Sequence, residues 1–372
     1  MKTKSLLLPV LALASMSMLL SCTGNKPVAE EPGLKSVFPD YTIGVALNVR
    51  QAAGQDKLAD SLVTRHFNSI VPENCMKHEV IHPAKDTYNF EDADQFVQYG
   101  VDRGMQIIGH CLVWHSQQAP WLFVGDDGQQ VSAEELKARM KEHITTVVTR
   151  YKGKITGWDV VNEAIVEDGS YRNSPWYQIL GEDFIPLAFQ YAHEADPDLE
   201  LYYNDYGMNV PGRREGVVRL IRQLKERGCR IDAVGLQSHM GMDYPDWNEF
   251  EASIQAYIAE GVDVQFTEVD MSALPSVNTG ANVSDTEEYK ESLNPYPNGL
   301  PAEVAAEWNA RMAKFFEILD KYKDHVKRVT AWGVTDEDSW KNNWPIPGRT
   351  DYCLWFDRQG NLKPFLQEKL TK

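Results

Sequence analysis

Eight short apolar segments, separated by longer amphipathic ones, constrain the fold of this chain more than any other feature. Each of the eight is rich in β-favouring residues and short enough to be a buried strand. Helical patterns lie between them, the clearest at 133–151, 212–227, 248–260 and 301–322. The strand-like segments are 43–48, 69–72, 106–114, 157–162, 199–204, 233–238, 263–268 and 328–334.

Strands that alternate with helices pair in parallel, and eight such units are typical of a sheet that closes on itself. The alternative is an open, doubly wound sheet. No glycine-rich phosphate-binding turn follows any of the segments, which argues against that alternative. We therefore predict an α/β fold, a single (β/α)8 TIM barrel that occupies residues 38–372.

The N-terminus has the pattern of an export signal. Lys2 and Lys4 precede an apolar run at 6–20, which is too short to span a membrane. The run ends in Leu19-Leu20-Ser21-Cys22, which resembles a bacterial lipobox. We predict a signal peptide at 1–21, a lipidated Cys22 and a flexible tether at 22–37, in a protein anchored to a bacterial membrane, the outer membrane being favoured. Ordinary secretion is the alternative.

Charge and cysteine usage exclude several functions. The formal net charge of −17 over 372 residues argues against nucleic acid or an anionic membrane surface as the main partner. Membrane attachment is expected through the lipid alone, and the protein is expected to be a monomer without a cofactor. Four further cysteines are scattered without a CxxC motif, so we predict no metal site; a disulfide between two of them stays open.

Two of the strand-like segments end in a glutamate. The run Trp158-Asp159-Val160-Val161-Asn162 leads to Glu163, and Val262-Asp263-Val264-Gln265-Phe266-Thr267 leads to Glu268. A carboxylate at the end of a buried strand is costly unless it has partners or a function. Strands four and seven face each other across the mouth of an eight-stranded barrel. Glu163 and Glu268 are therefore the candidate catalytic pair.

Two facing carboxyl groups suggest glycoside hydrolysis. One group protonates the leaving oxygen, and in a retaining enzyme the other attacks the anomeric carbon. Aromatic side chains fit sugar faces, and amides, lysine and histidine fit hydroxyl groups. Residues of these kinds follow seven of the eight strands, which packing alone does not explain.

At this point the chain resembles the glycoside hydrolase family 10 endo-β-1,4-xylanases, over roughly residues 38–370. The resemblance rests on several motifs that occur in the family's order. They are Glu73-Asn74-x-Met76-Lys77, Gly109-His110-x-Leu112-Val113-Trp114-His115-Ser116-Gln117, Trp158-Asp159-Val160-Val161-Asn162-Glu163, Tyr203-Asn204-Asp205-Tyr206, Gly235-Leu236-Gln237-Ser238-His239, Thr267-Glu268-x-Asp270 and Trp332-Gly333.

The resemblance implies retaining hydrolysis of xylan or xylo-oligosaccharides, with Glu163 as general acid/base and Glu268 as nucleophile. It implies supporting roles for Asn162, Gln237, His239 and Asp270. It also implies a set of sugar-binding residues, with Tyr206 on the aglycone side and the others on the glycone side: Glu73, Asn74, Lys77, His110, Trp114, Gln117, Trp332 and Trp340.

The chain departs from the family pattern in three ways. Pro120 stands one position late, His78 replaces a usual aromatic residue, and the loop at 272–300 looks long. That loop either overhangs the active face or is an uninvolved excursion. We also expect Glu268, with His239 beside it, to stay ionised, and Glu163 to keep its proton until the charge of Glu268 is lost on esterification.

Three rival functions remain. His78-Glu79-Val80-Ile81-His82 matches the HExxH pattern of zinc proteases, but Pro83 disfavours helical geometry at His82 and no third ligand is evident nearby. A xylan-binding lipoprotein without catalysis would use the same aromatic residues, yet would need neither Glu163 nor Glu268. A related barrel β-glycanase that cuts another glycan is the third.

Overall fold

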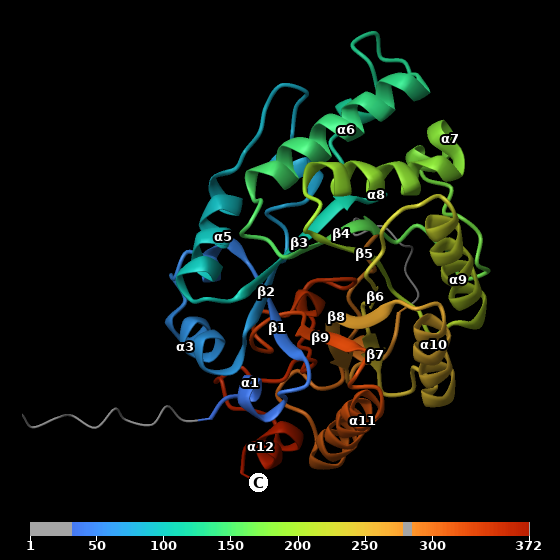
Figure 1. Ribbon diagram of the computed structural model, residues 1–372. Helices are drawn as coiled ribbons and strands as arrows, with labels where there is room; N and C mark the ends of the chain where they lie inside the picture. Colours follow the sequence, from blue (N-terminus) through green and yellow to red (C-terminus); the bar gives the residue numbers. More distant parts are fainter. Residues whose placement is uncertain (1–31, 278–284, 372) are drawn as a thin grey trace, which may run out of the picture. The chain divides into compact units, whose positions relative to one another are not determined.

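The computed structural model describes residues 32–277 and 285–371, which form one closed barrel of parallel strands inside a ring of helices (Figure 1). The predicted signal peptide, Cys22 and residues 23–31 of the predicted tether lie outside the described residues. Among the described residues, no helix has the length and apolar character needed to cross a bilayer.

All eight predicted strands are present. They run in the order β6-β5-β4-β3-β2-β1-β9-β8, and the pairing of β6 with β8 closes the ring. The closure confirms the barrel and excludes the open doubly wound sheet. The strands are β1 (Thr42–Leu47), β2 (Ser69–Pro72), β3 (Gln106–Val113), β4 (Gly157–Asn162), β5 (Glu200–Asp205), β6 (Ala233–Leu236), β8 (Asp263–Ser272) and β9 (Val326–Ala331).

A ninth short strand, β7 (His239–Gly241), has no counterpart in the sequence prediction. It pairs in parallel with the outer part of β8, where His239 faces Asp270. β8 is long enough to make this extra pairing because it continues to Ser272, beyond the barrel wall. The extension fixes the chain direction just after β6, where Gln237 and His239 lie.

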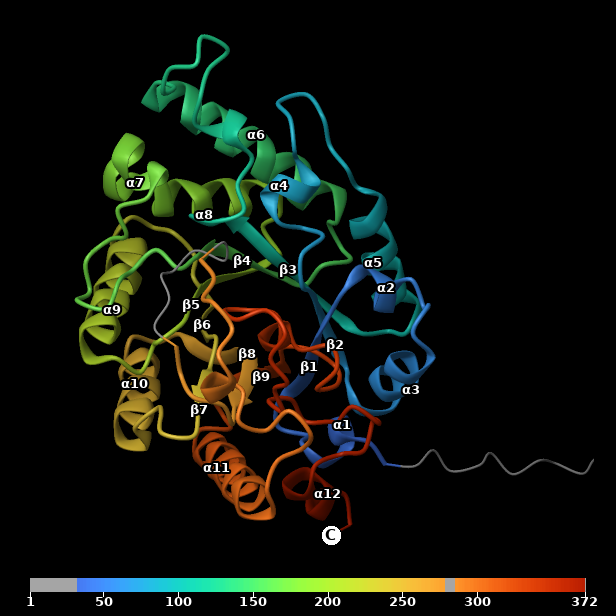
Figure 2. The ribbon, with the colours of Figure 1, turned by 180° about the vertical axis from the view of Figure 1, so that it is seen from behind.

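Helices cover the outside of the barrel (Figures 1 and 2). The four clearest predictions correspond to α6, α9, α10 and α11; Ser132 caps α6 by accepting a hydrogen bond from the Glu135 amide, as its sequence suggested. The helices are α1 (Leu34–Val37), α2 (Val49–Ala52), α3 (Lys57–His66), α4 (His78–Ile81), α5 (Glu91–Asp102), α6 (Ala133–Arg150), α7 (Pro175–Leu180), α8 (Phe184–Ala195), α9 (Pro211–Glu226), α10 (Trp247–Ala259), α11 (Ala302–Lys321) and α12 (Pro364–Leu370).

The predicted tether ends earlier than expected. Residues 34–37 form α1, and the side chain of Leu34 is fully buried in the core. The Leu34 amide also donates to Nδ1 of His66, at 3.3 Å. The prediction of a tether up to residue 37 is therefore wrong at its C-terminal end, because one leucine in a polar segment is enough to dock a helical turn.

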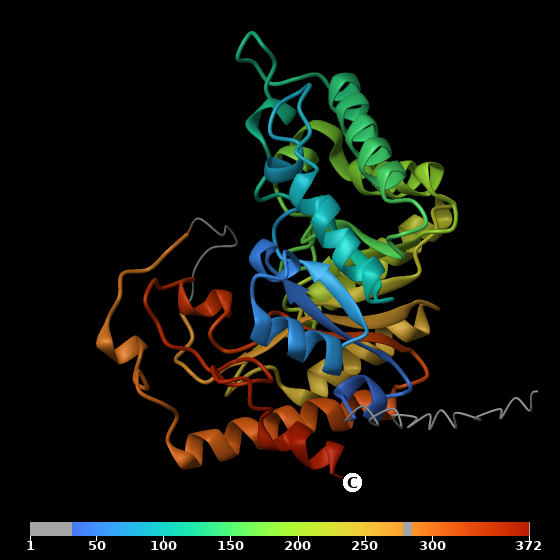
Figure 3. The same ribbon diagram turned by 90° about the vertical axis from the view of Figure 1, so that its left-hand side faces the viewer.

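The long loop after β8 packs against the loop after β9. The Glu287 amide donates to the Pro345 carbonyl at 2.8 Å, and the Thr350 amide donates to Asn294 Oδ1 at 3.1 Å. Figure 3 shows the two loops side by side at the same end of the barrel. The described part of this loop is thus attached to the segment that carries Trp340, rather than being an isolated surface excursion.

The four described cysteines, Cys75, Cys111, Cys229 and Cys353, are all buried and unpaired. No disulfide therefore joins any two of these four cysteines. Cys111 lies inside β3, where it fills space as a small apolar side chain.

The docking of α1 predicts a measurable contribution to stability. Leu34→Ala removes a fully buried side chain and should lower the free energy of unfolding by about 2 kcal/mol or more. Leu58→Ala is the matched control, since Leu58 is 43% exposed and the same change there should cost about 0.5 kcal/mol or less. Denaturant titration measures both. Equal effects would mean that α1 is not part of the folded domain.

Candidate active site

The polar strand ends predicted from the sequence meet at one end of the barrel. The carboxyl ends of parallel barrel strands carry the active-site residues in enzymes of this fold. Glu163 directly follows β4, and Glu268 lies in β8, at the end of the part that belongs to the barrel wall. Both are buried: Glu163 has 7% of its surface exposed and Glu268 has 5%. Buried carboxyl groups need polar partners, and both have them.

Glu163 is held through one carboxyl oxygen and through its backbone. Its Oε1 accepts hydrogen bonds from Gln237 Nε2 at 2.9 Å and from Asn162 Nδ2 at 3.2 Å. Its carbonyl accepts from Arg172 Nε at 2.6 Å. The other oxygen, Oε2, lies 3.8 Å from His115 Nδ1. Because both amide donors converge on Oε1, Oε2 is the oxygen left to exchange a proton with a ligand.

Glu268 is held through both carboxyl oxygens. Oε1 accepts from Asn204 Nδ2 at 2.9 Å, and Oε2 lies 3.2 Å from His239 Nε2. Every partner can act as a donor, so the two hydrogen bonds hold the carboxyl group in one orientation. The geometry suits a group that must present a negative charge.

A chain of side-chain amides connects the two glutamates. Gln237 Nε2 contacts both Glu163 and Asn162 Oδ1, the latter at 3.3 Å. Asn204 Nδ2 contacts both Asn162 Oδ1, at 3.0 Å, and Glu268. The ends of β4, β5, β6 and β8 therefore contribute five residues to a single hydrogen-bond network, in which Gln237 lies next to Glu163 as predicted.

Three non-glycine residues among those described have a positive φ, and all three belong to this end of the barrel. They are Gln117 at 48°, Glu163 at 59° and Ser238 at 60°. Such backbone conformations cost about 1–3 kcal/mol each and persist where surrounding contacts enforce them. Two hydrogen bonds hold the backbone of Glu163 in this conformation: its amide donates to the Asn204 carbonyl, and its carbonyl accepts from Arg172 Nε. Their clustering supports a functional site.

The charge on the Glu268 side is fixed by His239. Burial alone would lower the pKa of His239, but the carboxylate of Asp270 and hydrogen bonds to Asp270 and Glu268 outweigh it and raise the pKa to about 9. Burial works against ionisation of Asp270, yet His239 and Lys341 hold the pKa of its carboxyl below the usual value. His239 is thus a cation between two carboxylates at neutral pH.

Residues predicted to bind the glycone form a second cluster. Lys77 Nζ donates to Asn74 Oδ1 at 2.9 Å and to Gln117 Oε1 at 2.8 Å, and lies 5.1 Å from the ring centre of Trp114. Burial lowers the pKa of Lys77. Burial also raises the pKa of Glu73, although the charge of nearby Lys77 partly offsets that rise. The structure therefore brings this predicted set together at the ends of β2 and β3.

The predicted aromatic residues after β9 complete the same face. Trp332 contacts His110 edge-on, with ring centres 5.5 Å apart, and His110 Nδ1 lies 2.9 Å from Asp159 Oδ2. Trp340 donates its indole N–H to Asp270 at 2.8 Å and stacks on Trp344. Trp344 thus supports the ring of Trp340.

Tyr206 lies beside Glu163 rather than beside the Lys77 cluster. Arg172 connects them, since its Nη2 donates to the Tyr206 hydroxyl at 2.9 Å while its Nε binds the Glu163 carbonyl. Sequence analysis did not identify Arg172, Asn204 or Lys341 as site residues. Asn204 stood in a recognised motif and could have been chosen. Arg172 lies in a loop and Lys341 in a short 3-10 helix, and neither belongs to a recognisable motif.

The HExxH segment is only partly as expected. His82 leaves helical geometry, with φ −135° and ψ 62°, as Pro83 suggested. The expectation of no third ligand is wrong, because His143 of α6 joins His78 and His82. Glu79, the would-be general base of a zinc protease, instead accepts a hydrogen bond from Gln117 at 3.1 Å. The segment therefore does not form a protease site.

Two buried glutamates at opposing strand ends, joined by amides and flanked by tryptophans, define a barrel glycoside hydrolase. The model of glycosyl hydrolase family 10 matches residues 33–371. The chain belongs to this family, as the motifs predicted.

Individual relatives agree. The chain is similar to endo-1,4-beta-xylanase A of Xylanibacter ruminicola, with 52% identity that covers 91% of this chain and 92% of the relative. It is similar to the solved structure of a GH10 endoxylanase from a sugarcane soil metagenome, with 42% identity, a TM-score of 0.88, and coverage of 91% and 99%. A mutant xylanase of Thermoanaerobacterium saccharolyticum solved with xylotriose has 32% identity, a TM-score of 0.78, and coverage of 90% and 97%.

The raised pKa of His239 predicts a pH-dependent contribution to stability. That contribution is fully present below the unfolded pKa of about 6.5 and is lost as the pH rises through about 9. The difference in unfolding free energy between wild type and His239→Asn should therefore shrink across this window. Urea titrations at a series of pH values measure it, with His193→Asn on the exposed face of α8 as control. A difference that stays constant would contradict a cationic His239.

Proposed function

We propose that this protein is a retaining endo-β-1,4-xylanase that cleaves xylan by double displacement. The single observation that carries the proposal is the asymmetric environment of two buried glutamates in one hydrogen-bond network. Glu268 faces a cationic histidine, whereas Glu163 is held by neutral amides on one oxygen only. Membership of glycosyl hydrolase family 10 and the similarity to xylanases support xylan as substrate.

In the first step Glu268 attacks the anomeric carbon while Glu163 protonates the departing oxygen. Hydrogen bonds from Asn204 and His239 hold the Glu268 carboxylate in position for this attack. Oε2 of Glu163, which faces His115 at 3.8 Å, delivers the proton, because Oε1 is already bound by Gln237 and Asn162. The product of this step is a glycosyl ester of Glu268.

In the second step water hydrolyses the ester. Esterification removes the negative charge of Glu268, so the network around Glu163 no longer contains a second carboxylate. Glu163, now ionised after giving up its proton, takes a proton from the attacking water. Asp270 and Lys341 keep His239 in position through both steps.

The remaining site residues are assigned to sugar binding. Lys77, Asn74 and Gln117 form a polar group suited to sugar hydroxyls, with Glu73 and His110 next to it, and Trp114, Trp332 and Trp340 offer apolar ring surfaces. Tyr206, held by Arg172, is assigned to the aglycone side. Asn162 is assigned a contact with the sugar bonded to Glu268.

Covalent trapping tests the mechanism. A 2-fluoro-xylobioside with a good leaving group should add one 2-fluoro-xylobiosyl group, a disaccharide, to the wild type, and the mass increase should map to the peptide that contains Glu268. Glu163→Gln should still form the adduct, because a good leaving group departs without an acid, but it should release the sugar far more slowly. Glu268→Ala should form none. Intact-mass spectrometry and peptide mapping read all three.

The outcomes separate the rival functions. A wild-type protein that binds xylo-oligosaccharides but never forms the adduct would be a binding protein without catalysis. Adduct formation with a 2-fluoro-cellobioside, and none with the xylobioside, would indicate another β-glycan. A sugar on a residue other than Glu268 would overturn the assignment of the nucleophile.

We further propose that the chain is exported and anchored to a bacterial membrane, the outer membrane being favoured, by lipid on Cys22, and that it acts there as a monomer. The support is the run from Lys2 through Leu19-Leu20-Ser21-Cys22. A polymeric substrate is found outside the cell, which agrees with export.

Lipidation is testable on the full-length chain in a bacterial host. Labelled palmitate should be incorporated into the wild type and into Cys229→Ser, and should be absent from Cys22→Ser. The Cys22→Ser protein should also leave the membrane fraction. Incorporation that survives Cys22→Ser would refute a Cys22 anchor.

A further inference from the structure

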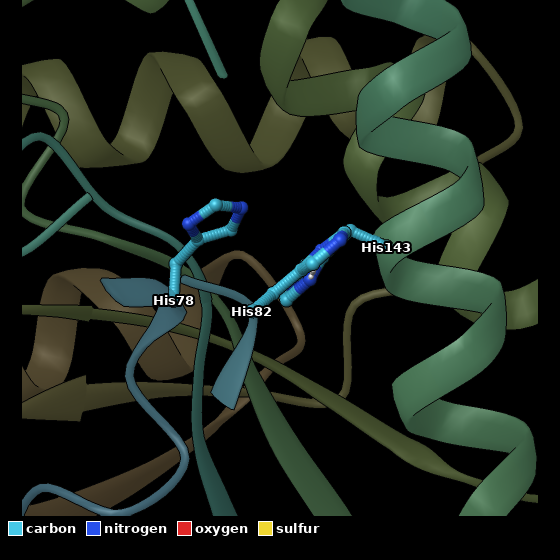
Figure 4. Close-up of side chains that lie close together, drawn as sticks. All are labelled: His78, His82 and His143. Carbon is cyan, nitrogen blue, oxygen red and sulfur yellow. Dashed lines mark hydrogen bonds between the residues drawn. The ribbon is translucent and has the colours of Figure 1, made fainter. Parts of the chain in front are cut away.

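Three histidines form a buried cluster behind the β2 and β3 loops. His78 begins α4, His82 follows its last residue, and His143 projects from the middle of α6 (Figure 4). One ring nitrogen from each lies within 4.8 Å of the others, and the residues are 2%, 0% and 3% exposed. Neither the proposed hydrolysis nor the substrate-binding residues make use of them.

The hydrogen bonds define which ring nitrogens are engaged. His82 Nε2 lies 3.2 Å from the Lys85 carbonyl, so it carries the proton and leaves the lone pair on Nδ1. That Nδ1 lies 3.1 Å from His143 Nδ1. A backbone carbonyl that orients one nitrogen while the other points at a shared centre is the usual arrangement of a metal-binding histidine.

Packing leaves part of the cluster unexplained. The Nε2 atoms of His78 and His143 are buried and have no hydrogen-bond partner among the described residues. A buried polar atom without a partner costs about as much as a lost hydrogen bond. The ring of His82 does stack on Tyr88, at 3.8 Å between centres, but stacking satisfies neither of those nitrogens.

We propose that His78, His82 and His143 bind one transition-metal ion of the Zn²⁺ type. Imidazole nitrogens suit such ions, and burial supplies the neutral form that a ligand needs. In tetrahedral coordination the ligand nitrogens stand about 3.3–3.4 Å apart. The Nδ1 atoms of His82 and His143 lie 3.1 Å apart, already close to this spacing. Without metal, His143 Nδ1 carries the hydrogen that they share; on metal binding this proton moves to His143 Nε2 through solvent, and rotation of the His78 ring brings in the third nitrogen.

Metal uptake has one identifiable competitor. The Ala119 amide donates to His78 Nδ1 at 3.2 Å, which places the proton of a neutral His78 on Nε2. His78 becomes a ligand when its ring turns out of this hydrogen bond. The fourth position of the ion is left to water, since no carboxylate belongs to the cluster within the described ranges.

The ion would stabilise the structure rather than catalyse a reaction. Glu79 is bound to Gln117, so no general base faces the cluster. The ion would join α4 to α6, two helices that α5 and β3 separate in the sequence. Lys77 immediately precedes His78, and Gln117 lies two residues before Ala119. The site therefore braces the two loops that carry these substrate-binding residues.

Cobalt titration tests the site directly. The untagged, full mature chain is treated with a chelator, dialysed and titrated with Co²⁺, whose visible absorption is intense only in tetrahedral sites. We expect one Co²⁺ per chain and displacement by Zn²⁺. His143→Gln should lose the absorption at least tenfold, and the exposed-residue control His193→Gln should keep it. Wild type without this absorption, or His143→Gln that retains it, would overturn the proposal.

Three further tests keep the proposal falsifiable if His143→Gln fails to fold. His78→Gln removes the ligand at the start of α4. If this variant folds, it should also lose the absorption, and retention of the absorption would again overturn the proposal. Zinc X-ray absorption of the wild type should report imidazole nitrogens and no sulfur. Sulfur ligands would place the ion at a cysteine and refute the histidine site. Zn²⁺ should also raise the melting temperature of the wild type and of His193→Gln, but not of His143→Gln. This test does not depend on xylan cleavage.

Discussion

The side-chain amide of Asn204 is the contact on which the catalytic geometry depends. Its nitrogen binds Glu268 and Asn162 together, and its oxygen accepts a hydrogen bond from the Thr267 hydroxyl at 2.6 Å. The Glu268 carboxylate determines which end of the amide faces it, because a carboxylate accepts hydrogen bonds and so takes the NH2 group; the Thr267 hydroxyl then donates to the amide oxygen. Gly235 leaves the room for this arrangement: a Cβ there would lie 2.3 Å from Asn204 Oδ1. Gly235 on β6 thus allows Asn204 to take the position from which it holds Glu268 on β8.

The two halves of the site differ in charge rather than in shape. On the Glu268 side a histidine cation lies between two carboxylates, with Lys341 behind them. On the Glu163 side the close partners are amides and the more distant His115. Because the barrel encloses both groups, little water screens this difference. The same pair of side chains can therefore perform different tasks, one as an anionic nucleophile and the other as a proton carrier.

Much of the architecture follows from local sequence patterns. Buried parallel strands are continuous apolar runs, so the eight barrel strands and their polar ends are visible before any contact is known. Glu163 and Glu268 stand out because a carboxylate at such an end is energetically anomalous. The family motifs then assigned their roles.

What the sequence could not predict depends on tertiary contacts. Helix α1 is four residues long without a side-chain cap, and it exists because Leu34 finds a pocket. The extra strand β7 requires the extended end of β8. His143 sits within an ordinary amphipathic helix, and only the fold brings it to residues some sixty positions earlier, with His82 as its partner. Arg172 acts through a backbone carbonyl, which leaves no trace in a motif.

The long loop after β8 is hydrogen-bonded to the segment that follows Trp340. Glu287 and Asn294 belong to one βα unit, and Pro345 and Thr350 to the next. The loop wall on that side of the barrel, formed by these two segments, is thus built from pieces that are far apart in the sequence. Transplanting either one alone into a sister enzyme would leave exposed backbone groups at the seam, so variation in this wall is expected to occur by paired exchange.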